Sequence, residues 1–145
     1  MEQKMTLTRD ADVVAAWKGS LALSKRLGLS LFKQACLAGA TLELCRHVVE
    51  QGRGGSFTLL DESDAASLRA RLVVDGCSTD LLGQGRGGLG REICVGAALP
   101  AVRLHQVAED LRAESSGVGA RVTLTIGEPR SARESRRPLA LAGRR

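Results

Sequence analysis

Two groups of residues in this sequence have types and spacing that could do chemistry, and the first is a glycine-rich stretch from Gly83 to His105. Its first half is a loop rich in glycine, and its second half turns helical from Ala97, with Pro100 tolerated in the first helical turn. A helix N-terminus presents unpaired backbone N–H groups, and glycines let a backbone approach a phosphate closely. The stretch therefore predicts a phosphate-binding lid, although glycine richness alone favours an ordinary surface loop.

The second group lies on a predicted helix, where Cys36, Glu43 and His47 share one face because their spacing follows the helical repeat. An acidic side chain on an otherwise apolar helix is costly unless it has a purpose. Three interpretations of Glu43 stay open: a working general base, a vestigial base, and a partly buried residue paired with Arg46 or His47. A zinc site using Glu43, His47, a cysteine and His105 is a further alternative. The four cysteines show no C-x-x-C spacing, which favours buried thiols instead.

Composition narrows the class of protein. With 145 residues and 43% hydrophobic content, the chain is long enough for one globular domain with a proper core. No apolar run approaches the roughly 20 residues of a membrane span. The amino terminus also lacks the apolar core of a signal peptide. We therefore expect a cytoplasmic protein without membrane contact.

The net charge of +5 is concentrated at the carboxyl terminus. Residues 128–145 hold six Arg against Glu128 and Glu134, a net of +4, which leaves +1 for residues 1–127. We therefore predict a single domain over residues 1–127 and a basic, disordered tail over residues 128–145. The domain has only Trp17, Phe32 and Phe57 to stack on bases, so no nucleic-acid binding is expected.

Helical periodicity precedes strand periodicity along the chain. Asp12 is expected to cap a first helix that Gly28 ends, and Ser30 to cap a second helix from Leu31 to Gln51. The period then changes to two, which predicts strands joined by polar turns. The expected strands cover residues 56–61, 67–75, 111–115 and 121–126, and the expected third helix covers residues 97–108. This order predicts an α+β two-layer sandwich, in which about three helices cover one face of a mainly antiparallel sheet.

Several segments, in this order, resemble motifs of the GHKL ATPase fold shared by Hsp90, gyrase and histidine-kinase catalytic domains. Residues 41–49 with 52–55 resemble its N box, and residues 71–76 resemble the strand that ends in its adenine-binding Asp. Residues 87–90, 96–104 and 115–122 resemble its lid, the start of the next helix and the final hairpin. Over residues 8–127 the chain is most similar to the anti-sigma-factor and RsbT-type serine kinases of bacterial stress and sporulation switches.

The resemblance implies a site for ATP and magnesium. Glu43 matches the helix glutamate regarded as the catalytic base of this family, and His47 stands where an asparagine would hold magnesium. Asp75 and Gly76 match the adenine-binding segment, although Asp75 at a strand end could equally begin a turn. The nucleotide-binding residues implied in the lid are Gly87, Gly88, Gly90, Gly96, Ala97 and Leu99.

Departures from the family pattern fall on this same site. Imidazole is a poor ligand for magnesium, which prefers hard oxygen donors, so with His47 in place of the asparagine no metal ligand is predicted. Neither glycine of the Asp-x-Gly-x-Gly pattern falls in register after Asp75, and Ala98 stands where a glycine is expected. Residues 91–95 are inserted between the two glycine clusters of the lid. Added side chains crowd a backbone that should touch phosphate.

The resemblance and these departures together imply a regulatory binding protein with weakened ATP binding. The implied partner is a STAS-domain antagonist or scaffold protein, or a sigma factor, and a homodimer is compatible with the family. The alternative is an active ATP-dependent serine/threonine kinase that phosphorylates a STAS-domain antagonist. His47 discriminates between them, because an active enzyme needs another oxygen ligand for magnesium.

Overall fold

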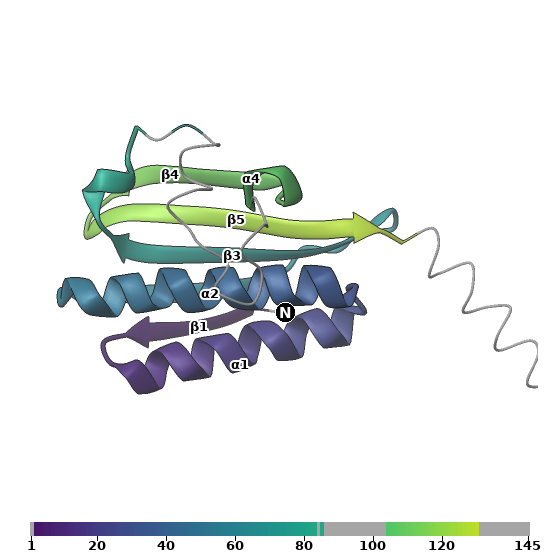
Figure 1. Cartoon of the computed structure of the whole chain (residues 1–145), viewed down its shortest axis with the longest axis horizontal. Helices are drawn as coiled ribbons and strands as arrows, with labels where there is room; N and C mark the ends of the chain where they lie inside the picture. Colours follow the sequence, from purple (N-terminus) through teal and green to yellow (C-terminus); the bar gives the residue numbers. More distant parts are fainter. Residues whose placement is uncertain (1, 84, 86–103, 131–145) are drawn as a thin grey trace, which may run out of the picture.

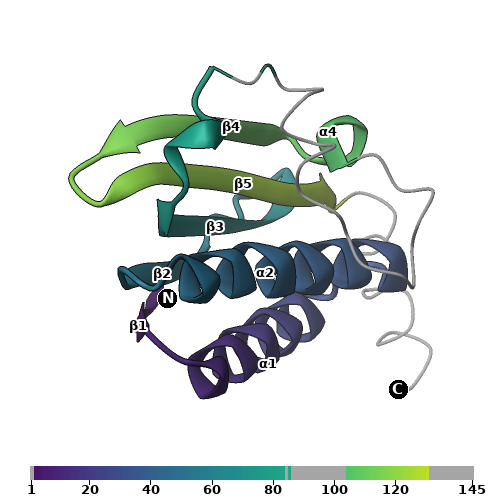
Figure 2. The same ribbon diagram turned by 60° about the vertical axis from the view of Figure 1, so that its left-hand side comes forward.

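The computed structural model describes residues 2–83, 85 and 104–130, which form an α+β fold. Its strands are β1 (Glu2–Leu7), β2 (Gly55–Asp61), β3 (Ser67–Cys77), β4 (Asp110–Ser116) and β5 (Gly119–Pro129). They pair antiparallel in one open sheet of order β1-β2-β3-β5-β4. Two long helices, α1 (Asp10–Leu27) and α2 (Leu31–Gln51), lie on one face of this sheet (Figures 1 and 2). The α+β sandwich with an antiparallel sheet, expected from the sequence, is confirmed.

The bounds of α2 follow from its end residues, as the sequence predicts. The Ser30 hydroxyl accepts a hydrogen bond from the Lys33 amide at 3.3 Å, which satisfies one of the unpaired N–H groups of the first turn. Gly28 and Gly52 end α1 and α2 in the left-handed conformation that a residue with a side chain rarely adopts.

The expected cap of α1 is wrong. The helix begins at Asp10, so Asp12 lies inside the first turn instead of preceding it. Its carboxylate reaches back and accepts hydrogen bonds from the backbone amides of Thr8 at 2.9 Å and Arg9 at 3.2 Å. These bonds, that from Thr8 first, lower the pKa of Asp12. The same carboxylate chemistry therefore stabilises the helix start from a position three residues later than a conventional cap.

One buried polar contact joins the two helices. Ser20 Oγ on α1 and Thr41 Oγ1 on α2 lie 2.7 Å apart, and both residues are fully buried. Thr41 donates its own hydroxyl proton to the Leu37 carbonyl at 2.8 Å, so Ser20 is the donor in the bond between the helices. The pair is satisfied, which removes most of the cost of burying two hydroxyl groups.

β1 is an element that the sequence prediction missed. Only Met5 and Leu7 of its six residues are apolar, and they lie on the helix side of the sheet with Gln3. A strand with so little apolar surface gives almost no signal of period two. The four predicted strands are present, each extended by one to three residues at an end, and β5 continues two residues beyond the expected domain end at residue 127.

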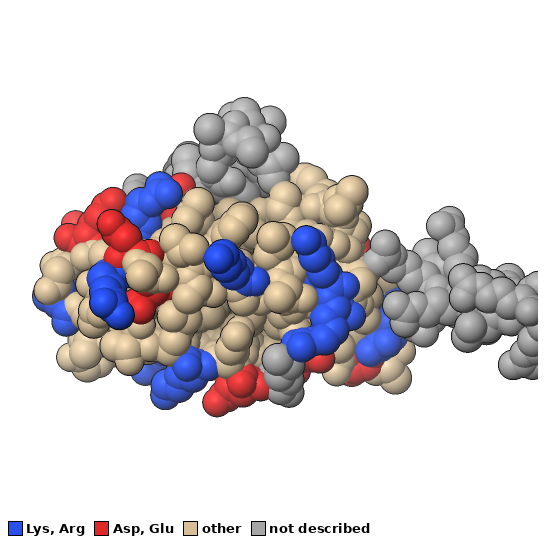
Figure 3. All heavy atoms as spheres, turned by 90° about the horizontal axis from the view of Figure 1, so that it is seen from below, with Lys and Arg blue, Asp and Glu red and all other residues tan. Residues whose placement is uncertain are grey.

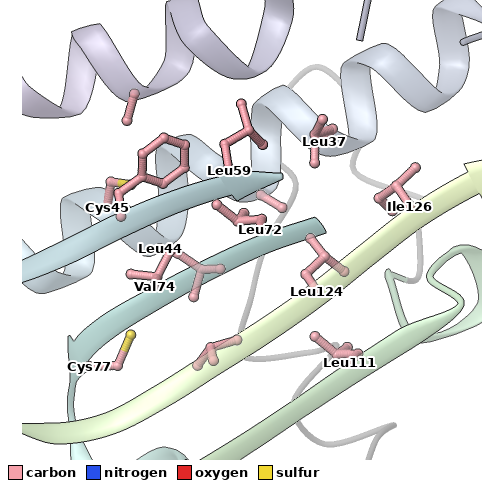
Figure 4. Packing of buried hydrophobic residues seen from close by; sticks show 14 of the residues in the cluster. Leu37, Leu44, Cys45, Leu59, Leu72, Val74, Cys77, Leu111, Leu124 and Ile126 are labelled. Carbon is pink, nitrogen blue, oxygen red and sulfur yellow. The ribbon is translucent and has the colours of Figure 1, made fainter. Parts of the chain in front are cut away.

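The core fills the space between the helices and the inner face of the sheet. Large apolar side chains of α2 point toward those of the central strands (Figure 4). The labelled members of this cluster are Leu37, Leu44, Cys45, Leu59, Leu72, Val74, Cys77, Leu111, Leu124 and Ile126, and all are buried. On β3 every second residue from Leu68 to Val74 is buried, so the intervening residues face the other side of the sheet.

That other side of the sheet, which we call the open face, is polar. Arg69 pairs with Asp64 at 2.8 Å and with Glu109 at 3.0 Å, and these contacts join the β2–β3 turn to the start of β4. Asp64 also accepts hydrogen bonds from the backbone amides of Ala66 and then Ser67, which lower its pKa to about 2. Charged side chains in exposed pairs of this kind hold local geometry more than they add stability.

The helix layer carries its charges differently. Seen from the α1 side, Lys and Arg side chains are distributed over a surface that is mostly uncharged, and Asp and Glu side chains gather at its left-hand end (Figure 3). Among the residues that the structure describes, no helix is both long and apolar enough to cross a membrane.

Candidate functional site

Helix α2 carries the two residues whose side chains are best suited to catalysis or ligand binding, Glu43 and His47. They lie one turn apart on the same face of the helix, and both are half-buried. The helix runs toward the carboxyl-terminal end of β3, so His47 contacts Ser78, the first residue after that strand. The structure thus brings this part of α2 into contact with the segment that follows β3.

The imidazole of His47 is already engaged. Its Nε2 accepts a hydrogen bond from the backbone amide of Ser78 at 3.0 Å. An accepting Nε2 must be unprotonated, which places the proton of the neutral ring on Nδ1. The Nε2 lone pair that a metal ion would need is therefore used to hold Ser78. A cation bound through Nε2 would have to break this bond and leave the Ser78 amide without its acceptor.

Ser78 is a site residue that the sequence interpretation did not single out. It follows β3 and caps the short helix η1 (Thr79–Leu81), since its hydroxyl accepts a hydrogen bond from the Asp80 amide at 3.2 Å. A serine two residues before an aspartate is a local signal of such a cap. No local signal marks its bond to His47, which is 31 residues earlier in the chain.

Glu43 is held only weakly. Its carboxylate lies 3.6 Å from the Arg46 guanidinium, and the side chains are 29% and 49% exposed. An ion pair of this length between residues three apart on a solvated helix face contributes only a few tenths of a kcal/mol, roughly 0.2–0.5. The carboxylate is therefore accessible. Of the interpretations considered for Glu43, pairing with Arg46 is seen, and it is too weak to explain the residue by itself.

Asp75 lies on the other side of the sheet from His47. It follows Val74, which points into the core, so its own side chain projects from the open face. There its carboxylate accepts hydrogen bonds from the Ser116 hydroxyl and the Gly76 amide and lies 3.5 Å from the Arg121 guanidinium. Asp75 lines a polar hollow of about 390 Å³ on that face. The structure does not bring Asp75 together with Glu43 and His47.

The alternation of β3 contains the signal that places Asp75. Leu72 and Val74 belong to the buried series, whereas Arg69, Arg71 and Asp75 belong to the series that faces outward. Because side chains alternate strictly along a strand, an aspartate one residue after a buried valine must point away from the helices. The resemblance suggested the residue type, but the register of the strand decides its direction.

Gly76 has a packing role in the described fold. Its φ is +101°, and a Cβ built on it would lie 2.7 Å from the Gly54 carbonyl oxygen and 2.9 Å from the Gly55 Cα. Gly55 is equally restricted, since a Cβ there would collide with the Asp75 carbonyl oxygen. The glycines after α2 and the glycine near the end of β3 thus allow two backbones to cross in contact. This contact accounts for Gly76 without a nucleotide.

The thiols near this crossing, Cys45 and Cys77, are buried. Burial raises the pKa of Cys45 to about 12 and that of Cys77 to about 12. A thiol must lose its proton to ligate zinc, so the environment of these cysteines disfavours a metal site. Within residues 2–83, 85 and 104–130, no group of three or more His, Cys, Asp or Glu side chains is placed to hold a metal ion.

The lid residues implied by the resemblance are Gly87, Gly88, Gly90, Gly96, Ala97 and Leu99, and all lie outside the described residues. The same holds for most of the third helix expected over residues 97–108, of which α4 (Leu104–Val107) is described. The described part of the site consists of an accessible carboxylate on Glu43, an engaged imidazole on His47 and the capped turn at Ser78.

Comparison with known proteins does not assign this arrangement to a family. The chain matches no model of a known protein family, and no curated protein matches its sequence.

Proposed function

We propose that this protein is a regulatory binding protein of the anti-sigma-factor serine kinase type, in which magnesium-dependent use of ATP is weakened or lost. Its partner is a STAS-domain antagonist or scaffold protein, or a sigma factor. The proposal rests on the sequence resemblance, and the α+β architecture that the resemblance requires supports it.

The observation that carries the proposal is the hydrogen bond between His47 Nε2 and the Ser78 amide. The resemblance implies a magnesium ligand at position 47, and the residue present is both a poor magnesium ligand and already bound to the backbone. Phosphoryl transfer depends on a metal ion that bridges the phosphates and neutralises their charge. A chain without this magnesium ligand keeps the surfaces that a partner protein could recognise and loses phosphoryl transfer.

Calorimetric titration with ATP and ADP, each with and without magnesium, tests the proposal. We expect weak nucleotide binding that magnesium does not strengthen. Binding of the partner protein should be equally tight with and without nucleotide. Micromolar affinity for ATP that depends on magnesium would overturn it.

One observation favours the second candidate, an active serine/threonine kinase. The Glu43 carboxylate is accessible and only weakly paired, as a general base for a hydroxyl must be. If the protein is a kinase, Glu43→Gln will abolish phosphorylation of a STAS-domain partner and leave binding of that partner intact. Arg46→Gln is the matched control, because it removes the partner of Glu43 and keeps the carboxylate. Equal and negligible phosphorylation by all three proteins would exclude this candidate.

A further inference from the structure

β1 is an edge strand that borders a small hollow. It pairs with β2 along one side, and no other described strand pairs with it. Between β1 and α1 lies a hollow of about 120 Å³, lined by Gln3, Gly19, Ala22, Leu23, Arg26 and Leu59. A strand edge with free N–H and C=O groups is a template for one more strand.

The hollow is shaped to receive side chains from such an added strand. Side chains of a strand alternate between the two faces of a sheet, so every second residue of a strand added beyond β1 would point toward α1. Leu23 and Leu59 give the hollow a buried apolar floor. Gly19 lets the Gln3 side chain of β1 pack directly against α1, because a Cβ at that position would lie only 2.6 Å from the Gln3 side-chain oxygen.

The carboxyl terminus of this chain leaves the fold at the same end of the sheet. The registers join Glu2 to Leu60, Leu60 to Arg71 and Arg71 to Thr125, so β1 begins at the end of the sheet where β5 ends, four residues short of Pro129 (Figure 1). An added strand would lie four strand spacings from β5, or about 19 Å at ~4.8 Å each. The nine residues from 131 to 139 span up to about 30 Å when extended, which is more than enough.

The sequence beyond the described fold has the pattern that this edge requires. Residues 138–142 read Pro-Leu-Ala-Leu-Ala, so Leu139 and Leu141 would share one side of an extended strand. Pro138 lacks an N–H donor and suits the first residue of an edge strand. Two arginines at 136 and 137 precede it, and the exposed carboxylates of Glu2 and Asp61 lie at the end of the sheet where the tail would arrive. Glu2 and Asp61 attract these arginines, whereas Arg26, which lines the hollow and acts on Asp61, opposes them, so charge favours that orientation only in part.

From these placements we infer that the carboxyl-terminal segment of this chain docks on the free edge of β1, with Leu139 and Leu141 in the hollow between β1 and α1. The tail then serves as an internal strand that covers an otherwise open edge. A partner that adds a strand to β1 must first displace it. This inference does not depend on nucleotide binding.

Hydrogen–deuterium exchange of the β1 amides in the full chain tests the inference. Leu139→Ser/Leu141→Ser is expected to speed exchange across Glu2–Leu7 at least tenfold. The matched control, Ala140→Ser/Ala142→Ser, alters residues that would face away from the hollow and is expected to leave exchange unchanged. Ala22→Asp, on the exposed side of α1, is expected to reproduce the leucine variant from the other side of the contact.

Two results would overturn the inference. One is equal exchange of the β1 amides in the full chain and in the leucine variant. The other is protection of β1 that rises with protein concentration and survives both leucine substitutions, which would assign the edge to a second copy of the chain. Urea unfolding of each variant confirms that the domain is folded, so a change in exchange reports on docking alone.

Discussion

Replacing Gly76 by alanine should destabilise the protein far more than replacing a glycine that has only a conformational role. At Gly76 the backbone has φ of +101°, and the added Cβ would lie 2.7 Å from the Gly54 carbonyl oxygen. A positive φ costs a residue with a side chain about 1–2 kcal/mol. Forcing an extra carbon into a packed contact costs typically about 1–3 kcal/mol more. We expect Gly76→Ala to lower the free energy of unfolding by about 2–5 kcal/mol in total.

Gly52 supplies the control. Its φ of +72° is also positive, but nothing lies within 4 Å of a Cβ at that position. Gly52→Ala should therefore cost only the conformational part, about 1–2 kcal/mol. Urea unfolding gives both free energies, and an unchanged slope shows that the change lies in stability. Equal losses for the two variants would refute the packing role of Gly76 and leave room for the nucleotide-binding role that the resemblance implies.

Three further predictions concern the described fold. Ser20→Ala should cost about 0.5–1.5 kcal/mol, and a double-mutant cycle with Thr41→Val should show coupling, since Ser20 donates to Thr41 in a buried site; additive losses would argue against the bond. Asp64 has a folded-state pKa of about 2, below its usual value of 3.8. Its stabilising contribution is therefore present above pH 4 and lost as the pH falls toward 2. In the Asp64→Asn variant the free energy of unfolding should therefore fall less steeply between pH 4 and pH 2 than in the unmodified protein; an equal fall in both proteins would contradict this. Cys45 and Cys77, with pKa values of about 12, should resist alkylation at pH 8 until the protein unfolds, which peptide mass spectrometry can follow; modification of the folded protein would contradict their burial.

Elements whose signals are local could be predicted from the sequence. The Ser30 cap, the glycines that end both helices and the alternation of β3 each depend on residues within a few positions, and the structure has them as expected. The start of α1 was misplaced because Asp12 accepts hydrogen bonds from residues before it, a role that a carboxylate can play from more than one position. The sequence does not predict β1, because the strand is polar and its pairing partners lie 48 (Leu7 to Gly55) to 58 (Glu2 to Leu60) residues later.

The candidate site shows a similar division. That Glu43 and His47 share a helix face follows from their spacing alone. The contact between His47 and Ser78 does not, because it depends on how α2 packs over the end of β3. The direction of Asp75 could have been predicted, since alternation places it with Arg69 and Arg71 on the outward side. The resemblance concerns only the residue type at position 75, whereas the alternation of β3 determines which face of the sheet its side chain lies on.

In this structure the Nε2 lone pair of His47 accepts the hydrogen bond of the Ser78 amide and is therefore not available to a metal ion. Nitrogen-15 NMR of the His47 ring and the Ser78 amide, recorded during a titration with magnesium and ATP, measures this directly. We expect the signals of an accepting Nε2 and of the Ser78 amide to stay unchanged up to millimolar concentrations of nucleotide. Saturable shifts of both signals at micromolar magnesium–ATP would contradict it.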